Sequence, residues 1–387
     1  MSAKALTRRD FMKSVSTAAA SGLLLGGCIP YPSGIVSLVD SASPITPPEE
    51  VLPDAVLFGL YSPATASDPR AAVRSVCGHL DWSWLSPGDS VFIKLACNSG
   101  NPHPAVTSPN TVRAVVGELF DRGAGRILVG DQGGMEDVST NRDGSRRGST
   151  RELTERNGLH QAIVGSGAEP YYFDDQAYEE GFVQANMDLD GHHWSQPPHL
   201  ARIITEVDHV IYLPRLSSHV MAGYTLGHKI AVGWLRTDSR SAMHLDFLNL
   251  HNRYVELNYH PLLRDRLRLT ITLAEKVLLD LGPNEGTIAD LDSWVVIASS
   301  HLANHDAVGV AVLAYVDGVM PEAPRLVRAA KDYQKGIGSD PSLWRAYEIL
   351  GGIPSAIRVN LLGQEPGAAL RMSLDSYDGG ILNLMAG

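Results

Sequence analysis

The sequence predicts an α/β protein with a mostly parallel sheet and helices on both faces. From about residue 55 onward, apolar runs alternate with amphipathic segments, and the connections between them are short. With 44% hydrophobic and 7% aromatic residues, the 387-residue chain can form one large domain or two smaller lobes. Parallel strands present functional groups beyond their carboxyl ends, so we expect the functional site in a crevice at those strand ends.

The first part of the body shows this alternation most clearly. Strands are predicted at 56–61, 90–96 and 126–131, and helices at 69–85 and 109–122. The second helix is the best delimited, because Ser108 can cap its first amides, Pro109 suits its first turn and Gly123 can end it. The segment is therefore predicted to be a βαβαβ unit.

The rest of the body continues the pattern less regularly. We predict strands at 170–174, 208–213 and 294–299, helices at 225–235 and 306–315, a histidine-bearing segment at 239–258, and a further element at 267–281. Two short helical segments are predicted to close the chain. No internal repeat or low-complexity tract is present, so residues 55–387 are assigned to one α/β domain of one or two lobes.

The amino end has the features of an export signal. Arg8 and Arg9 precede Asp-Phe-Met-Lys and an apolar stretch at 18–25, which is shorter than the ~20 residues that a membrane helix needs. This pattern resembles the signal of the twin-arginine pathway, whose substrates cross the membrane folded and often loaded with a cofactor. The alternative is the basic start of an ordinary signal.

Residues 25–28, Leu-Gly-Gly-Cys, resemble a bacterial lipobox, which predicts lipidation of Cys28. The alternative is a Gly-Gly-Cys sequence of no consequence. We expect residues 1–28 to engage the twin-arginine export machinery, and the mature protein to lie in the periplasm or at the cell surface, touching the membrane only through its lipid anchor. Residues 29–54 are rich in Pro and Ser without apolar periodicity, which predicts a tether.

Composition argues against two classes of function. A formal net charge of −11 is unsuited to nucleic acid, and the basic cluster at 142–151 is predicted to be a solvated loop. If Cys28 is lipidated, Cys77 and Cys97 remain, too few for an iron-sulfur or four-cysteine zinc site from this chain alone. These two cysteines could form a disulfide or stay as buried thiols, and the sequence does not decide between them.

Polar residues follow two of the predicted strands. Lys94 ends one strand and is followed by Asn98 and Thr107, and Asp131 ends the next strand before a Gly-Gly pair that permits close approach of a ligand. A lysine at the end of a buried strand often only extends its ammonium to solvent, which is the structural alternative. The convergence of both strand ends favours a functional role.

The densest group of polar residues lies later in the chain and comprises Arg215, His219, His228, Lys229, Arg240, His244 and His251. Histidine ligates metals and transfers protons near neutral pH, and a buried lysine can act as a base. His244 and His251 are seven residues apart, so on a single helix they would share one face. Some of these histidines could equally be core residues. Asp306 is predicted to start a helix, either as its cap or with its carboxylate aimed at the crevice.

From about Val91 to Leu313 the chain resembles the family numbered 362 among domains of unknown function. The resemblance is carried by Lys94 to Asn98, Thr107-Ser108-Pro109, Gly130-Asp131, Leu213-Pro214 leading to His219, Lys229, Arg240 to His244, Leu250-His251 and Asp306-Ala307-Val308-Gly309. The family usually has Lys at Arg215, Asn at Ile230 and Asp near Leu273. Arg cannot be deprotonated at working pH, which argues against a base at Arg215. The family has no settled activity, and many members carry ferredoxin-like cysteine motifs that this chain lacks.

The first functional hypothesis is an exported enzyme that acts on a small anionic molecule. The assigned catalytic candidates are His219, Lys229, His244, Lys94 and Asp131, and the substrate-binding candidates are Asn98, Thr107, Arg215 and Arg240. A metal ion or metallocofactor would be held by His219, His244, His251 and Asp306. Redox, isomerase and hydrolase chemistry remain open. The rival hypotheses are a non-catalytic carrier of a metal or metallocofactor and a lipoprotein scaffold. Neither a Gly-x-Ser-x-Gly elbow beside a strand nor a phosphate loop is present.

Overall fold

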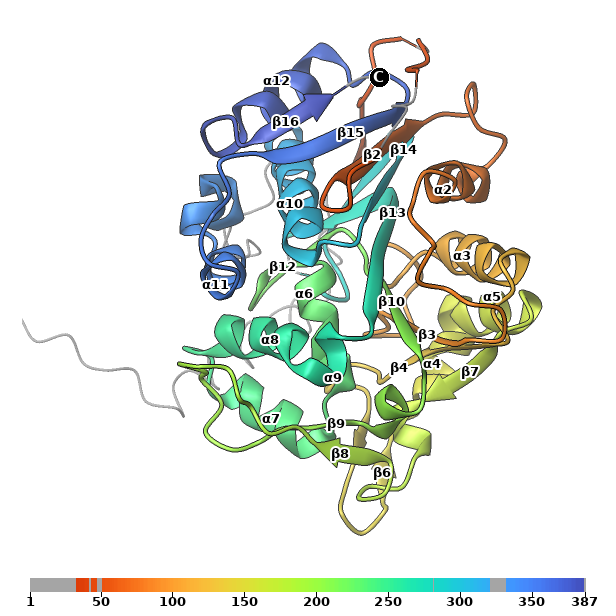
Figure 1. Ribbon diagram of the computed structural model, residues 1–387, viewed down its shortest axis with the longest axis vertical. Helices are drawn as coiled ribbons and strands as arrows, with labels where there is room; N and C mark the ends of the chain where they lie inside the picture. The colour runs from red at the N-terminus through yellow and green to blue at the C-terminus, as the bar shows by residue number, and fades with distance from the viewer. Residues whose placement is uncertain (1–32, 42, 47–50, 281, 321–331, 386–387) are drawn as a thin grey trace, which may run out of the picture. The chain divides into compact units, whose positions relative to one another are not determined.

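The fold is built on one 12-stranded mixed sheet. The computed structural model describes residues 33–41, 43–46, 51–280, 282–320 and 332–385. Residues from Ser33 onward form a single compact unit, and helices flank the sheet (Figure 1). The predicted α/β class is therefore confirmed.

The main path of the sheet has the order β16-β15-β2-β14-β13-β10-β3-β4-β7. In chain order these strands are β2 (Val56–Tyr61), β3 (Ser90–Leu95), β4 (Arg126–Asp131), β7 (Glu169–Tyr172), β10 (His209–Leu213), β13 (Leu267–Leu279), β14 (Thr287–Ser299), β15 (Ile357–Gly363) and β16 (Leu382–Met385). Strand β14 runs antiparallel to its neighbours β13 and β2. The other neighbours along this path are parallel, so the carboxyl ends of β10, β3 and β4 point the same way.

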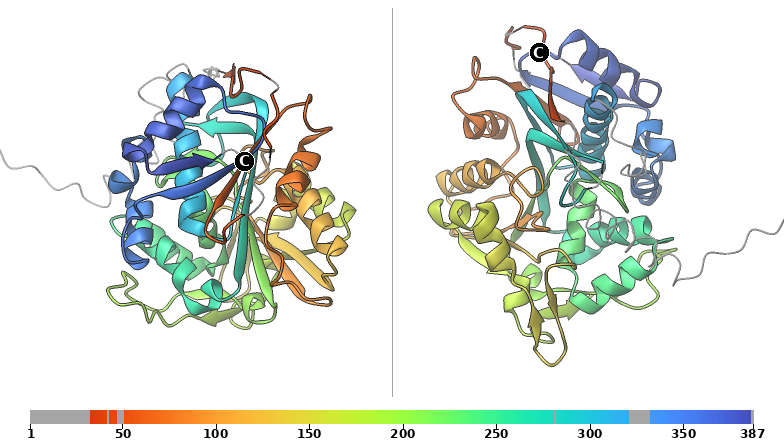
Figure 2. Two further views of the ribbon diagram at one scale, coloured as in Figure 1. Left: turned by 45° about the horizontal axis from the view of Figure 1, so that its top comes forward. Right: turned by 180° about the vertical axis from the view of Figure 1, so that it is seen from behind.

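Helices cover both faces of the sheet, as predicted (Figure 2). One face is covered by α2 (Pro69–Cys77), α3 (Pro109–Asp121), α4 (Thr150–Asn157) and α5 (Leu159–Gly165). The other face is covered by α6 (Gly227–Ile230), α8 (Leu250–Tyr259), α10 (Leu302–Val319), α11 (Pro341–Ile349) and α12 (Ala368–Ser376). Phe92 and Ile93 show the consequence, because these consecutive residues of β3 point into different cores.

The predicted βαβαβ elements are present, with two differences. Helix α2 ends at Cys77 rather than near residue 85, since the chain turns at Gly78 and the Trp82 indole N–H donates to the Cys77 carbonyl oxygen at 2.9 Å. Strands β2 and β3 are consecutive in sequence, yet β14, β13 and β10 lie between them in the sheet. A strand–helix pattern indicates how elements alternate but does not determine their order in a sheet.

Three later segments also differ from the prediction. The helix expected at 225–235 is divided into strand β12 (Gly223–Thr225), the short helix α6 and a 3₁₀ turn (Ala231–Trp234). The histidine-bearing segment is two helices, α7 (Thr237–Leu245) and α8. The two closing helices, α11 and α12, are present, but β15 and β16 accompany them.

Part of the predicted tether is folded onto the body. Strand β1 (Ser33–Val36) pairs in parallel with β14, and Leu38 is buried. The backbone N–H of Ile45 donates to the carbonyl oxygen of Gly363 at 2.8 Å. Exposed backbone at the end of a long strand accepts a short segment even when its side chains show little periodicity. The export signal and Cys28 lie outside the described residues, and no helix among those described is both long and apolar enough to span a membrane.

Candidate functional site

Lys94 and Asp131 form a buried ion pair where β3 and β4 end. The Lys94 ammonium and the Asp131 carboxylate Oδ1 are 2.5 Å apart, and Lys94 also donates to the Leu95 carbonyl oxygen at 2.8 Å. Asp131 accepts two backbone N–H bonds at 2.7 Å, from Cys97 to Oδ2 and from Gln132 to Oδ1. Burial lowers the pKa of Lys94, and the neighbouring Asp131 opposes this. The carboxylate is thus held in one orientation by three donors.

Gly233 allows a third segment to reach this pair. A Cβ atom built on Gly233 would lie 2.1 Å from Asp131 Oδ1 and 2.3 Å from Lys94 Nζ, far inside van der Waals contact. Only glycine therefore lets the 3₁₀ turn after α6 pack against the two charged groups. This close approach brings Lys229, four residues earlier, to the same strand ends.

Lys229 lines a small cavity together with Asp131, Asn98 and Arg240. The cavity has a volume of about 20 Å³, which is room for roughly one water molecule. Lys229 is partly exposed. Burial, reinforced by the guanidinium groups of Arg240 and Arg215 and opposed by Asp131, lowers its pKa to about 7. Its amine can therefore gain or lose a proton near neutral pH.

Two arginines have unused hydrogen-bond donors: Arg240, which lines this cavity, and Arg215, whose charge lowers the pKa of Lys229. Arg240, from α7, donates through Nη1 to the Gly133 carbonyl oxygen at 2.8 Å, but its buried Nε has no partner among the described residues. Arg215 follows β10 and donates through Nη1 to the carbonyl oxygens of Pro104 at 3.0 Å and Pro283 at 2.8 Å. Its buried Nε and Nη2 atoms lack a partner within the described chain. Burial lowers the pKa of Arg215 to about 9.

The charges at these strand ends do not balance. Lys94, Lys229, Arg215 and Arg240 are cationic side chains, and the Asp131 carboxylate raises the pKa of three of them, Lys94, Lys229 and Arg240. In the part of the chain that the structure describes, Lys94–Asp131 is the one ion pair that these four cations form. A buried charge without a partner is expensive, so the group is poised to receive an anion. We call these five residues the cationic site.

Two histidines near the cationic site are held in opposite tautomers. His219 accepts backbone N–H bonds at Nδ1 from Met221 at 3.1 Å and Ala222 at 3.2 Å, so its proton is on Nε2. His244 lies 2.8 Å through Nδ1 from the Arg240 carbonyl oxygen, which can only accept, so Nε2 of His244 carries the lone pair. Burial and nearby cations lower the pKa of His219 and bring that of His244 to about 3. One imidazole thus offers a donor and the other an acceptor.

His251 and His244 are not on one helix, contrary to the prediction. The chain leaves the helical conformation at Asp246, so His244 belongs to α7 and His251 to α8. Both nevertheless contribute to lowering the pKa of His219, after burial, Lys229 and Arg215. His251 is turned toward the hydroxyls of Tyr254 and Ser342, each 2.9 Å from its Nδ1.

Asp306 does not start its helix and does not face the cationic site. Helix α10 begins at Leu302 with His301 as its cap, because the His301 Nδ1 accepts the Asn304 backbone N–H at 3.2 Å. Asp306 instead lies within the helix, fully buried, with both carboxylate oxygens engaged. The predicted helix start was wrong by four residues, since the cap is a histidine rather than an aspartate.

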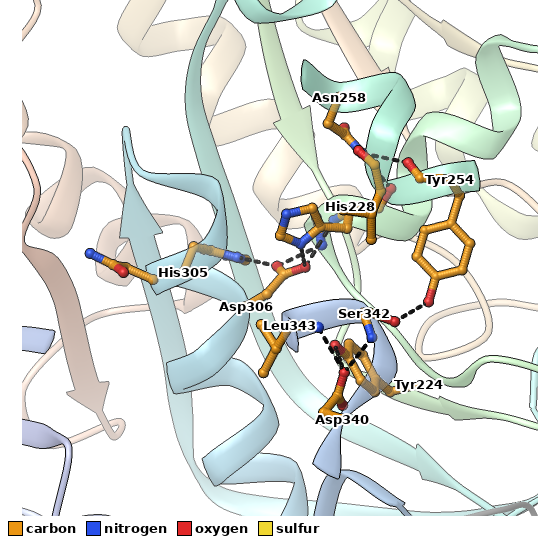
Figure 3. Close-up of polar contacts among 12 residues, drawn as sticks. Tyr224, His228, Tyr254, Asn258, His305, Asp306, Asp340, Ser342 and Leu343 are labelled. Carbon is orange, nitrogen blue, oxygen red and sulfur yellow. Dashed lines mark hydrogen bonds and ion pairs between the residues drawn. The ribbon is translucent and has the colours of Figure 1, made fainter. Parts of the chain in front are cut away.

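The Asp306 carboxylate accepts four bonds of 2.8 Å, as Figure 3 shows in part. Two come from the backbone N–H groups of Gly227 and His228, which begin α6, and two come from the imidazole Nδ1 atoms of His228 and His305. Burial raises the pKa of Asp306, but its histidine partners outweigh it and the pKa is well below its usual range. Asp306 therefore caps α6 from another helix, and α6 carries Lys229.

The family model described as Domain of unknown function (DUF362) matches residues 91–311. The chain belongs to this family. The matched residues include the whole cationic site, together with His219, His244 and Asp306. No curated protein matches the chain.

Two solved structures resemble this DUF362 member weakly. One is a crystal structure of a Thermotoga maritima protein, 12% identical with a TM-score of 0.36, covering 59% of this chain and 54%, about half, of that one. The other is the lactate racemase apoprotein from Thermoanaerobacterium thermosaccharolyticum, 10% identical with a TM-score of 0.38, covering 89% of this chain and 98% of that one. At these values neither structure bears on the chemistry of the site.

The four candidate metal ligands do not form a set in this DUF362 member. Asp306 uses its oxygens within its own network, and His251 contacts two hydroxyls. Among the described residues, no three His, Cys, Asp or Glu side chains are grouped so as to hold a metal ion. The described residues therefore do not fit a metal ion bound by protein ligands alone.

The remaining candidates have mixed positions. Asn98 lines the small cavity, but Thr107 is buried away from it and donates to the Leu213 carbonyl oxygen at 2.5 Å while accepting the Ala96 N–H at 2.9 Å. Thr107 thus ties the end of β3 to the end of β10. Cys77 and Cys97 are both buried free thiols, which decides the question that the sequence left open.

His228 lies within the histidine-rich stretch of the sequence but is assigned no role there, and Gly233 is not singled out. His228 precedes Lys229 directly, and its link to Asp306 crosses 78 residues of sequence, so no local pattern reveals it. Gly233 was detectable only as a glycine inside a predicted helix, where such a residue has a destabilising effect of ~1 kcal/mol and usually marks a special contact.

Proposed function

We propose that this protein is an enzyme that binds a small anion at the cationic site and transfers a proton to or from it. The observation that carries the proposal is the set of buried donors without acceptors: Nε and Nη2 of Arg215 and Nε of Arg240, as found within the described residues. A carboxylate or phosphate has the charge and the acceptor oxygens that such groups require.

Lys229 is the proton-transfer group in this proposal. Its pKa of about 7 places the amine between its two protonation states at neutral pH, which suits a general acid or base. The Nε2–H of His219 is a donor for an oxygen that gains negative charge, and the bare Nε2 of His244 is an acceptor. Asp131 keeps the ammonium of Lys94 in place and raises the pKa of Lys229.

A ligand larger than one water molecule requires the cavity of about 20 Å³ to open. Arg240 and His244 both belong to α7, which ends at Leu245, and the residues after it at 247 and 248 are exposed. Because Arg240 of α7 forms part of the cavity wall, a shift of this helix is one way in which the cavity would open.

The test is titration of the full chain with inorganic phosphate, acetate and malonate by isothermal calorimetry between pH 6 and pH 9. One of these anions is expected to bind saturably, with affinity falling as pH rises through about 7, because Lys229 loses its charge. Lys229→Met should weaken binding and remove this pH dependence. The control is Lys276→Met, since Lys276 is half exposed and pairs with Asp290.

Catalysis is tested separately by following carbon-bound hydrogen of each bound carboxylic acid in D₂O by nuclear magnetic resonance. Deuterium uptake that disappears in Lys229→Met supports proton transfer. Absence of saturable anion binding, or equal binding by Lys229→Met and the Lys276→Met control, would overturn the proposal. If hydroxy, keto and amino acids bind but none exchanges its carbon-bound hydrogen for deuterium, the protein binds anions without catalysing proton transfer.

A carrier of a metallocofactor is the second candidate function. His244 favours it, because its Nε2 lone pair is available at a partly exposed side chain beside an anion-binding group. An organic, anionic cofactor would supply the other metal ligands, and the cations would bind its charged groups. Elemental analysis of protein purified from its native host tests this, with stoichiometric metal expected in the wild type and lost in His244→Ala.

We also propose that the protein is exported and held at the membrane by a lipid attached to Cys28. It is supported by the twin arginines and the Leu-Gly-Gly-Cys sequence. Replacing Arg8 and Arg9 by lysine should trap the protein inside the cell, and Cys28→Ser should release it from the membrane fraction. Unchanged fractionation of both variants would contradict it.

A further inference from the structure

A second cavity lies beside α8 and α11 and shares no residue with the cationic site. Its volume is about 630 Å³, within the usual range for a small-molecule site. Its polar lining comprises Asp190, His193, Asn252, Arg345 and Glu348, with the indole of Trp344 beside them. Helices α8 and α11 pack against each other in the structure (Figure 1). We call this cavity the α8–α11 pocket.

His193 is fixed in the pocket by buried charged groups. Its Nδ1–H donates to Glu256 Oε1 at 2.6 Å, and its backbone N–H donates to Glu256 Oε2 at 2.9 Å. Its carbonyl oxygen accepts from Arg253 Nε at 2.9 Å. The side chain is 32% exposed, so the imidazole edge that remains, with the Nε2 lone pair, is accessible. His193 is therefore an oriented hydrogen-bond acceptor in the pocket wall.

The buried charges of the pocket are paired with one another. Arg345 donates to Glu256 Oε1 through Nη2 at 2.8 Å and to Glu348 Oε2 through Nη1 at 2.6 Å. Of these groups Arg345 and Glu256 are buried, whereas Glu348 and Asp190 are exposed. The pocket thus offers hydrogen-bonding groups rather than an unbalanced buried charge, and its occupant does not need to be an ion.

Trp344 provides a flat apolar surface between two cavities. Its side chain is 52% exposed although it is one of the largest apolar groups of the chain. Another cavity, of about 310 Å³, also contacts Trp344 and Glu348 and continues along Gly351 and Gly352. Neither glycine has a side chain, so bare backbone forms this part of the wall. The two cavities thus share Trp344 and Glu348 in their walls.

We propose that the α8–α11 pocket binds a saccharide of at least two rings. The apolar face of one ring would stack on the Trp344 indole, which favours flat, amphipathic partners. Hydroxyl groups both donate and accept, so they match the acceptor Nε2 of His193, the carboxylates of Asp190 and Glu348, and the amide of Asn252. The proposal is independent of the anion chemistry at the cationic site.

The test is titration of the full chain with cellobiose and with N,N′-diacetylchitobiose, followed by Trp fluorescence and by saturation-transfer nuclear magnetic resonance. At least one disaccharide is expected to bind with a dissociation constant in the millimolar range or tighter, and more strongly than glucose. Trp344→Ala should weaken this binding at least tenfold, or about 1.4 kcal/mol. Asn252→Ala should weaken it less, because one hydrogen bond to an exposed site contributes little.

Met372→Ala is the matched control, since Met372 is also a large exposed apolar side chain, 71% exposed, on α12. It should bind the disaccharide like the wild type. Putrescine is titrated in parallel. Absence of saturable disaccharide binding, binding that Trp344→Ala leaves unchanged, or putrescine binding that excludes the sugar would overturn the proposal.

Discussion

The cationic site and the α8–α11 pocket both contain buried charged side chains, but they balance them differently. In the pocket, Arg345 joins two carboxylates, and Glu256 accepts bonds from both Arg345 and His193. In the cationic site, Arg215 and Arg240 keep buried donors without acceptors among the described residues. Buried charges without partners destabilise a fold and persist where function requires them. The comparison teaches that the cationic site needs an anion from outside to satisfy its donors. In the α8–α11 pocket the buried charges already satisfy one another, and the pocket wall is free to bind an uncharged ligand.

The largest expected effect comes from removing the carboxylate of each region. Asp131→Asn should lower the free energy of unfolding by about 3–5 kcal/mol, because it leaves the buried Lys94 ammonium without its ion-pair partner. Glu256→Gln should lower it by less, because Arg345 keeps its ion pair with Glu348. Phosphate should restore part of the stability of Asp131→Asn only, since a bound anion replaces the missing charge there. Urea denaturation with and without phosphate measures this. If phosphate restored the stability of both variants equally, the two regions would not differ in their need for an anion.

A smaller effect is expected from Lys229→Met. The pKa of Lys229 falls from 10.5 to about 7 on folding, so between these values the unfolded chain binds a proton that the folded chain does not. The free energy of unfolding therefore rises with pH in this window, and the destabilising effect of Lys229 is complete only below about pH 7. Lys229→Met should stabilise the protein by roughly 2–4 kcal/mol at pH 6, and by progressively less toward pH 10.

Denaturation curves at pH 6, 8 and 10 test this prediction, with Lys276→Met as the exposed control. The control should show little change at any pH, because Lys276 is 47% exposed. A stabilisation by Lys229→Met that grows with pH would contradict the lowered pKa of Lys229.

Gly233→Ala probes how closely the 3₁₀ turn approaches the ion pair. The added methyl would meet Asp131 and Lys94, so we expect a loss of about 1–3 kcal/mol and of anion binding. Gly165→Ala is the matched control, since a Cβ there meets nothing within 4 Å and Gly165 ends helix α5. It should be neutral or slightly stabilising. Thermal unfolding with anion titration distinguishes the two variants.

The smallest stability effect is expected in the α8–α11 pocket. Trp344→Ala removes a side chain that is 52% exposed, so the free energy of unfolding should change by less than about 0.5 kcal/mol. The same change should markedly weaken disaccharide binding. A large loss of stability would instead mean that Trp344 belongs to the core, and the two regions would no longer differ in the way described.

Much of the fold was predictable because strands and helices follow local patterns. Strand β2 has the predicted bounds, and α3 begins at Pro109 after its Ser108 cap and is followed by Gly123 with positive φ. Strands β15 and β16 were missed, since short strands among helical segments show no clear period. The convergence of Lys94 and Asp131 also followed from sequence, because adjacent parallel strands end at the same edge.

The sequence by itself determined the α/β class, the strand ends that carry Lys94 and Asp131, and the concentration of Lys, Arg and His around them. Only the tertiary structure decided that Asp306 caps the helix of Lys229 and that Gly233 touches the ion pair. It also decided that His219 and His244 have opposite tautomers. The physical reason is that local patterns report backbone propensity and burial, whereas pKa values, tautomers and the pairing of charges depend on contacts between residues far apart in sequence.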